Sequence, residues 1–419
     1  MHGAEDAIAE LEERLRRFPA KRYPVQHATA QFHLGVALVE SGDLVRAEAA
    51  LAAAAANFDP RALSVEHGKA LNALGAVLRL AGRHGEALPI LVRAVATFEA
   101  GGGMAEQGAA LFNLGLVRRE AGDLEGAANA LTESRGRFEA ARSPQAAAGA
   151  ARELGVVHLG GGDLDAARRA LEDAVELAGA AGDEALAGDA ANVLGLVELA
   201  ADRPQAALDA FSAAVGAHPR GVRPQGYAMA KANLALAQER AGEPTAARVS
   251  ARQALGVPDA PAPVRSQAAE VFARLTRQPG LDGGPSSAGA DAVALMEAEP
   301  PTRRARIVRE ELARWLDRDP DGLRGEAGEW IDAQLERHGT ASDLAEELLA
   351  GLLELSPAEM ERIIRAIVGA LSARPPGDQA QFRAQVAMAA ARFHVPQLLR
   401  LRDAFNAIAA EEGEPATWR

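Results

Sequence analysis

The apolar residues of this chain recur with a fixed period of 40 residues. A leucine followed by a residue without bulk returns in every copy, at Leu34-Gly35, Leu74-Gly75, Leu114-Gly115, Leu154-Gly155, Leu194-Gly195 and Leu234-Ala235. Seven residues later stands a turn residue, and five further on an alanine; the turn residues are Gly42, Gly82, Gly122, Gly162, Asp202 and Gly242, and the alanines are Ala47, Ala87, Ala127, Ala167, Ala207 and Ala247. A period of this length predicts a stack of repeated structural units.

Each unit is predicted to be a pair of helices. In the first copy, Leu34 and Leu38 lie on one stripe of a helix expected from about Gln26 to Ser41, and Gly42 ends it because glycine adopts the left-handed conformation without strain. The second helix is expected to follow an N-cap aspartate (Asp43, Asp123, Asp163) or to begin with proline in its first turn (Pro204, Pro244).

The small residues predict that the two helix backbones approach each other closely. Gly35 on the first helix and Ala47 on the second leave little side-chain volume between the helices. A leucine placed at Gly115 is therefore expected to overpack the pair and to cost roughly 1–3 kcal/mol.

These positions resemble the tetratricopeptide repeat, a helical hairpin with Leu-Gly in the first helix, a Gly-Asp turn and alanines in the second. The resemblance covers roughly residues 5–276. The period is longer than the usual period of about 34 residues, and the large aromatic residues of the first helix are mostly absent. The chain looks like the longer repeats of signalling and spindle-orientation scaffolds. The resemblance implies an all-α fold, an α-solenoid of about six helical hairpins, and a function as a scaffold or adaptor that binds another protein.

The ends of the repeat region and a change of composition define the expected domains. Asp6–Phe18 is predicted to be a lone second helix and Val264–Arg277 a lone first helix, which cap the stack, so the solenoid spans residues 1–277. Residues 278–301 are rich in Gly, Pro and Ser and are predicted to form a flexible linker, although a short helix over residues 290–299 is compatible with the pattern.

Residues 302–419 are predicted to form a small helical bundle that resembles no family we recognise. Its expected helices are Thr302–Asp317, Leu323–Arg337, Ser342–Leu355, Ser356–Ala373, Gln379–Phe393 and Pro396–Ala410. A capping box opens the fourth of them, and the large core residues are expected to be Trp315, Trp330, Phe382 and Phe393.

The composition of the chain limits the compartment and the classes of partner that we expect. The chain has no cysteine, so disulfides and thiolate chemistry are excluded, and a cytoplasmic location is expected. No signal peptide or membrane span is read. The net charge of −13, most of it after residue 277, argues against nucleic-acid binding, and Thr302–Glu311 is too mixed in charge to change that. Arginine is much more frequent than lysine, and alanine and glycine are abundant. This composition is typical of a GC-rich genome, and we expect a bacterial source.

Signatures of catalysis and of cofactor or metal binding are absent from the sequence. The nine histidines have no metal-ligand spacing, and the glycine runs at 101–103 and 160–162 lack a phosphate-loop context. We therefore expect no cofactor, no metal and no enzyme activity. The remaining alternative, an enzyme with a site in the bundle, has only loose candidates: His338, His394, Asp343 and Glu359.

The resemblance places a concave groove along the first helices, with an apolar wall and spaced polar residues. The candidate peptide-binding residues are Phe32, His33, Lys69, Asn72, Arg79, Phe112, Asn113, Arg119, Arg152, Asn192 and Asn233. Asn can bond a peptide backbone and Arg can pair with a carboxylate, so an extended or helical acidic peptide is the expected ligand. Ordinary solvated polar residues are the alternative interpretation of the same positions.

Three sources of that peptide stay open: another protein, a second copy of the chain, and the chain's own acidic C-terminal bundle. The second function hypothesis is a regulatory protein in which the repeats sense a ligand and the bundle acts on a signalling partner.

Overall fold

The computed structural model describes residues 2–101, 103–277, 287–337, 339–414 and 418, and these residues form helices and turns without any strand. The chain separates into two compact units, residues 1–202 and residues 203–419. No helix in the described part of the chain is long and apolar enough to cross a membrane. The all-α expectation is confirmed.

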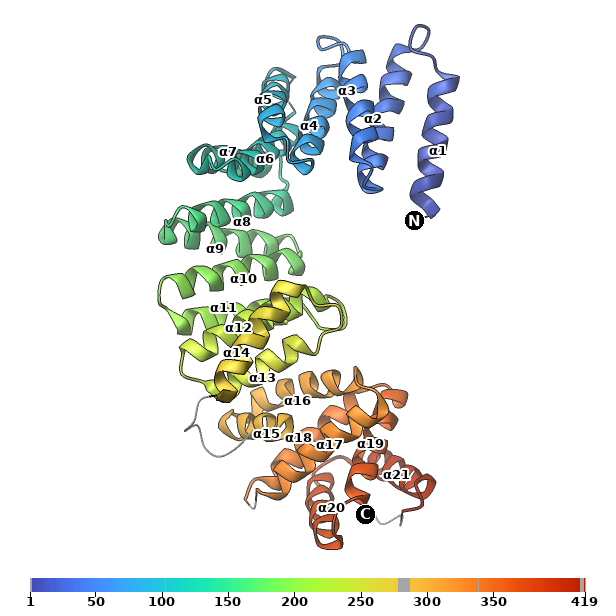
Figure 1. Cartoon of the computed structure of the whole chain (residues 1–419), viewed down its shortest axis with the longest axis vertical. Helices are drawn as coiled ribbons and strands as arrows, with labels where there is room; N and C mark the ends of the chain where they lie inside the picture. Colours follow the sequence, from blue (N-terminus) through green and yellow to red (C-terminus); the bar gives the residue numbers. More distant parts are fainter. Residues whose placement is uncertain (1, 102, 278–286, 338, 415–417, 419) are drawn as a thin grey trace. The chain divides into compact units, whose positions relative to one another are not determined.

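The first unit is a stack of antiparallel helices that lie side by side (Figure 1). A single helix, α1, precedes four hairpins, α2/α3, α4/α5, α6/α7 and α8/α9, and each hairpin packs on the next. Helix α10 ends the unit. The bounds are α1 His2–Arg17, α2 Pro24–Glu40, α3 Leu44–Asn57, α4 Ser64–Leu80, α5 His84–Gly101, α6 Met104–Glu120, α7 Leu124–Ala140, α8 Pro144–Gly160, α9 Leu164–Ala180 and α10 Glu184–Ala200.

The predicted turns and caps form as expected. Gly42 has φ of 82° and Asp202 has φ of 55°, so the turn residue of the period is left-handed even where it is not glycine. The carboxylates of Asp43, Asp123 and Asp163 each accept a hydrogen bond from a backbone N–H in the first turn of the following helix. The small residue of the first helix faces the leucine that recurs in the second helix, as a Cβ atom at Gly35 would meet the side chain of Leu51.

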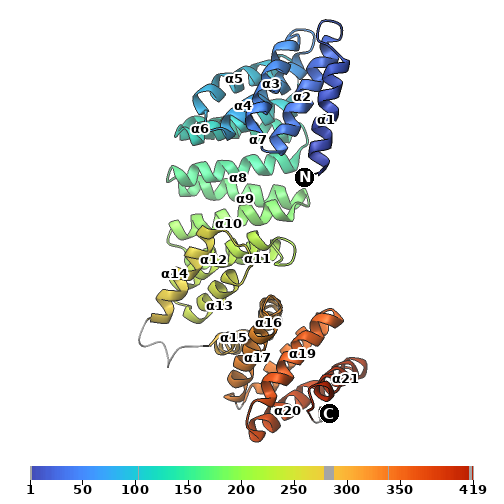
Figure 2. The same cartoon turned by 45° about the vertical axis from the view of Figure 1, so that its right-hand side comes forward.

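The second unit contains the last repeats and the C-terminal helices. Its helices are α11 Pro204–Ala217, α12 Pro224–Arg240, α13 Pro244–Leu255, α14 Ala262–Arg277, α15 Ala288–Ala298, α16 Pro301–Leu316, α17 Pro320–Leu335, α18 Ala341–Glu354, α19 Pro357–Ser372, α20 Pro376–Ala390 and α21 Val395–Glu411. The helices α15, α17, α19 and α21 pack in succession as one layer (Figure 2). The helices α16, α18 and α20 pack in succession as the other.

Aromatic residues fill the core between the two layers. Trp315 and Trp330 are each 1% exposed and meet edge to face at 5.7 Å. Phe382 is buried as predicted, whereas Phe393 is only partly buried. The predicted capping box at Ser356 and Glu359 is present.

Residues 288–298 of the predicted linker form the short helix that the sequence allowed, α15, while residues 278–286 lie outside the described part of the chain. Val293 and Met296 are fully buried, and α15 packs on both α13 and α17. The Gly, Pro and Ser content dominated the sequence pattern, but burial of these apolar side chains stabilises the helix. As a result, the last repeats and the C-terminal helices belong to one compact unit.

Candidate partner-binding surfaces

The first helices of the first unit present the candidate residues on neighbouring surfaces. Phe32 and His33 lie on α2 with their rings 5.5 Å apart; Phe32 is half-buried against the core and His33 is exposed. Phe112 on α6 is also half-buried and packs against two apolar clusters. Phe32 and Phe112 therefore contribute mainly to the packing of the helices, and only part of each ring is accessible to a ligand.

Polar contacts link α4 to α6. The amide of Asn113 on α6 donates to Asn72 Oδ1 on α4 at 2.9 Å. The ammonium group of Lys69 on α4 lies 3.3 Å from Glu106 on α6. Three of the candidate residues thus hold α4 and α6 together.

The three candidate arginines form a charged line across α4, α6 and α8. Arg79 donates to Glu120 at 2.8 Å. Arg119 and Arg152 both donate to the carboxylate of Glu153, the second at 2.6 Å. The Glu153 side chain is 10% exposed, whereas those of Arg119 and Arg152 are 28% and 30% exposed.

The sequence predicts these arginines as anchors for a ligand but does not reveal their acidic partners, Glu120 and Glu153. Glu153 has no counterpart in the period, since the same register holds His33, Ala73 and Asn113. The available signal was a lone acidic residue on a helix face that otherwise carries arginine.

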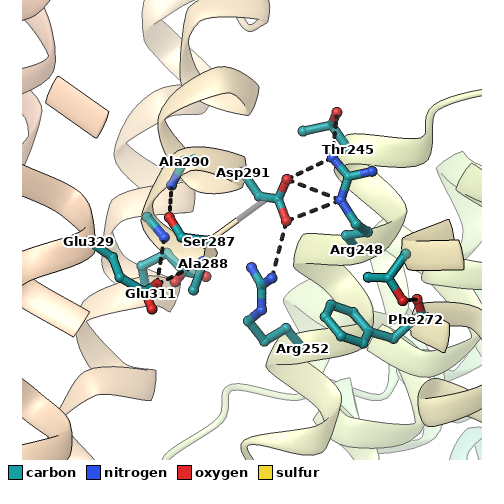
Figure 3. A network of polar contacts seen from close by, with 12 residues as sticks. Thr245, Arg248, Arg252, Phe272, Ser287, Ala288, Ala290, Asp291, Glu311 and Glu329 are labelled. Carbon is teal, nitrogen blue, oxygen red and sulfur yellow. Dashed lines mark hydrogen bonds and ion pairs between the residues drawn. The ribbon is translucent and has the colours of Figure 1, made fainter. Parts of the chain in front are cut away.

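A second polar network joins the last repeat to the C-terminal helices inside the second unit (Figure 3). Asp291 on α15 is 1% exposed. Arg248 on α13 donates to both of its oxygens, at 2.7 to 3.1 Å, and Arg252 adds a bond at 3.1 Å. Two guanidinium groups therefore compensate one fully buried carboxylate.

The network continues through α16. Arg314 is 1% exposed and donates to Glu311 at 2.8 Å and to Glu326 at 2.6 Å. Burial alone would raise the pKa of Glu326, but the hydrogen bond and charge of Arg314 outweigh it and lower the pKa below its ordinary value. Gln253 on α13 donates to Glu311 at 2.7 Å, which ties this cluster to the repeat.

Comparison with known families identifies the family of the chain. Two sequence models described as tetratricopeptide repeat match the chain, one over residues 66–140 and the other over 2–62, 112–184 and 152–222. Together they cover more than half of the chain. The chain belongs to the tetratricopeptide repeat family. As a member of this family, it is a protein-interaction scaffold.

Several solved structures resemble the tetratricopeptide repeat chain in fold. BtubC from P. vanneervenii is 20% identical with a TM-score of 0.45, covering 51% of this chain and 90% of that one. The apo quorum sensor NprR from B. thuringiensis is 11% identical with a TM-score of 0.48, covering 84% and 99%. Apo RapI is 11% identical with a TM-score of 0.42, covering 64% and 99%. No curated protein matches the sequence.

The two remaining asparagine candidates lie in different units of this tetratricopeptide repeat protein. Asn192 on α10 is 7% exposed and belongs to the first unit. Asn233 on α12 is 6% exposed, belongs to the second, and accepts a hydrogen bond from Gln267 on α14 at 2.8 Å. Both are buried, so neither presents an open amide to a peptide.

The loose catalytic candidates have structural contacts. Glu359 caps α19, and Asp343 accepts from exposed Arg392 at 2.7 Å. His394 stands at the start of α21, and His338 lies outside the described residues. In the part of the chain that the structure describes, no group of three His, Asp or Glu side chains is arranged to hold a metal.

Proposed function

We propose that this tetratricopeptide repeat protein binds a segment of another protein on the first-helix face of its first unit, and that Arg119 and Arg152 receive a carboxylate of that segment. The observation that carries the proposal is the sharing of one buried carboxylate, Glu153, by two partly exposed guanidinium groups. Along the whole charged line, the three guanidinium groups of Arg79, Arg119 and Arg152 face the two carboxylates of Glu120 and Glu153, which leaves one positive charge in excess.

The physical basis is charge-assisted hydrogen bonding. A guanidinium group has five N–H donors, and its contact with Glu153 engages only some of them. Hydrogen bonds to charged groups contribute about 1.5–3 kcal/mol each when water is partly excluded. An incoming carboxylate on Arg152 therefore restores charge balance without displacing Glu153.

A peptide selection tests this proposal. A displayed peptide library is selected on the whole chain, and the selected peptides are titrated against the wild type, Arg152→Gln and Arg137→Gln. Arg137 on α7 is the matched control because it pairs with Glu133 on the second-helix side of the stack. We expect acidic peptides whose affinity falls at least about tenfold in Arg152→Gln and is unchanged in Arg137→Gln.

Two outcomes would contradict the proposed carboxylate site. If selected peptides bind Arg152→Gln as tightly as the wild type, while circular dichroism shows both variants folded, the carboxylate site is refuted. Selection of peptides without acidic residues would also refute it.

A regulatory function is the second candidate, favoured by the buried network between α13, α15 and α16. Through it, the last repeat and the C-terminal helices have one shared set of contacts, so a ligand that alters the repeats can alter α15. Hydrogen exchange on the whole chain, with and without a selected peptide, measures this. Unchanged exchange over residues 288–316 would remove the hypothesis.

The proposal also includes a bacterial, cytoplasmic setting. It is supported by the lack of cysteine and by the excess of arginine over lysine. Fractionation of a source cell, with an antibody to the chain, tests the location directly.

A further inference from the structure

Trp418 is held against the last two helices of the second unit by contacts that resemble the recognition of a peptide. The side-chain amide of Asn406 on α21 donates to the Trp418 carbonyl oxygen at 2.9 Å. The Trp418 backbone N–H donates to Asn406 Oδ1 at 3.0 Å. One asparagine thus bonds both backbone groups of a single residue, a contact that any residue except proline can make in the place of Trp418.

The indole ring supplies the selectivity that the backbone contacts lack. Trp418 is 6% exposed, and its ring lies 4.4 Å from that of Phe405, with Arg383 of α20 at 5.7 Å from its centroid. A cation over an aromatic face and a neighbouring ring both favour a large aromatic side chain. The rest of the groove is lined by apolar side chains and a second guanidinium group from α18, α20 and α21: Leu349, Val386, Ala387, Ala390, Leu398, Leu401 and Arg402.

Trp418 belongs to the apolar core of the C-terminal helices but does not fill this groove completely. A cavity of about 20 Å³ remains among Trp418 and the apolar side chains that line the groove. The indole Nε1 is buried and has no hydrogen-bond partner among the described residues. Both features leave Trp418 less completely packed and hydrogen-bonded than a fully matched occupant of the groove.

An acidic residue accompanies the tryptophan. Glu414 lies 3.8 Å from Arg383, the same guanidinium group that stands over the indole ring. The groove therefore contacts a pattern, an acid and then an aromatic residue four positions later, together with the backbone of the aromatic residue.

We propose that the groove between α20 and α21 is a binding site for a peptide segment of a partner protein that carries a tryptophan preceded by an acidic residue, and that Trp418 occupies the site within the chain. The partner's tryptophan takes the place of Trp418 between Phe405 and Arg383. Its backbone takes the two hydrogen bonds of Asn406.

Binding of a peptide that copies the internal occupant tests the proposal. The fluorescently labelled peptide EGEPATWR, which reproduces residues 412–419, is titrated against the whole chain as wild type, Trp418→Ala and Trp418→Ala/Asn406→Ala. The peptide EGEPATAR is the matched control ligand. Asn406 is half-buried on a helix, and alanine has a high helix propensity, so the double variant is expected to fold.

We expect Trp418→Ala to bind EGEPATWR at least about tenfold more tightly than the wild type, in which the tethered tryptophan competes at high effective concentration. The double variant is expected to lose this gain, and EGEPATAR is expected to bind none of the three proteins. Equal binding to wild type and Trp418→Ala, or unchanged binding in the double variant, would overturn the proposal. A concentration-dependent dimer of the wild type that Trp418→Ala lacks would overturn it in favour of exchange between two copies of the chain.

Discussion

Gly115 on α6 lies so close to Leu131 on α7 that a Cβ atom at residue 115 would be 2.6 Å from Leu131 Cγ. The leucine itself is fully buried. The same contact recurs between Gly75 and Leu91 at 2.5 Å, one period earlier. In the four hairpins of the first unit, the glycine of the first helix therefore makes room for the leucine of the second, and this contact sets the distance between the two helices.

Replacing Gly115 with alanine is expected to destabilise the first unit by about 1–3 kcal/mol, because the added methyl group forces Leu131 or the helix backbone to move. Helix propensity alone would favour alanine by about 1 kcal/mol, so the sign of the result decides which effect dominates. Urea unfolding followed by far-ultraviolet circular dichroism measures the change.

The control is Gly136→Ala in α7 of the same hairpin, where a Cβ atom would meet nothing within 4 Å. This variant is expected to be stabilised by roughly 0.5–1 kcal/mol. A Gly115→Ala protein as stable as Gly136→Ala would show that the hairpin does not depend on the close contact.

Arg142→Gly is expected to stabilise the first unit by about 0.5–1 kcal/mol. Arg142 joins α7 to α8 with φ of 55°, a conformation that costs a residue with a Cβ atom about 1–2 kcal/mol, part of which is offset by the flexibility of glycine in the unfolded chain. One period later, Gly182 occupies the same turn with φ of 70°. Gly182→Arg should have the opposite effect in the same unfolding experiment; a loss of stability in Arg142→Gly would contradict this explanation.

The repeat architecture was predictable because its determinants are local and periodic. Leu34-Gly35 mark the apolar face of the first helix, Gly42 ends that helix, and Gly35 with Ala47 lets the two helices approach closely. These residues lie close together in the sequence, and the pattern returns every 40 residues. The C-terminal helices followed from the same signals, with Ser356 and Glu359 opening a helix where expected.

The contacts of the candidate site were not predictable because they pair residues that follow no period. Glu153 lies 34 residues after Arg119, and Asp291 lies 43 residues after Arg248. An isolated sequence shows that charges are present, but which of them meet depends on how neighbouring helices pack. The position of Asp291 among apolar residues was a local hint that it needs a basic partner.

Asp291→Asn is expected to destabilise the second unit by about 3–5 kcal/mol, because Arg248 and Arg252 are left without their carboxylate in a buried place. All three tryptophans belong to the second unit, so urea unfolding followed by tryptophan fluorescence reports on this unit.

Asp403→Asn serves as the control for Asp291→Asn. Asp403 pairs with Arg402 at 2.8 Å on the surface, with both side chains largely exposed, and its loss is expected to change stability by less than about 0.5 kcal/mol. An equal effect of the two substitutions would mean that the buried network does not hold α15 in place.

Acid is expected to destabilise the second unit partly through Glu326. Burial opposes ionisation of this carboxyl group, but the hydrogen bond and charge of Arg314 outweigh burial and lower its pKa below the ordinary value of 4.5. A lowered pKa in the folded state means that the stabilisation is present above the ordinary pKa and is lost as the pH falls through the folded-state pKa. Glu326→Gln should therefore be less stable than the wild type at neutral pH and should lose less stability on acidification to about pH 3.5.

Glu347 on α18 is expected to change stability with pH in the opposite direction to Glu326. Burial raises its pKa above the ordinary value, and the charges of Glu346 and Asp343 add to the rise although Arg304 opposes it. The folded state therefore favours the neutral carboxyl group, and this contribution is lost as the pH rises through the raised pKa. Glu347→Gln should be more stable than the wild type at neutral pH and lose more stability on acidification, the reverse of Glu326→Gln. Tryptophan-monitored urea unfolding at both pH values compares the two variants, and a change of the same sign in both would contradict these assignments.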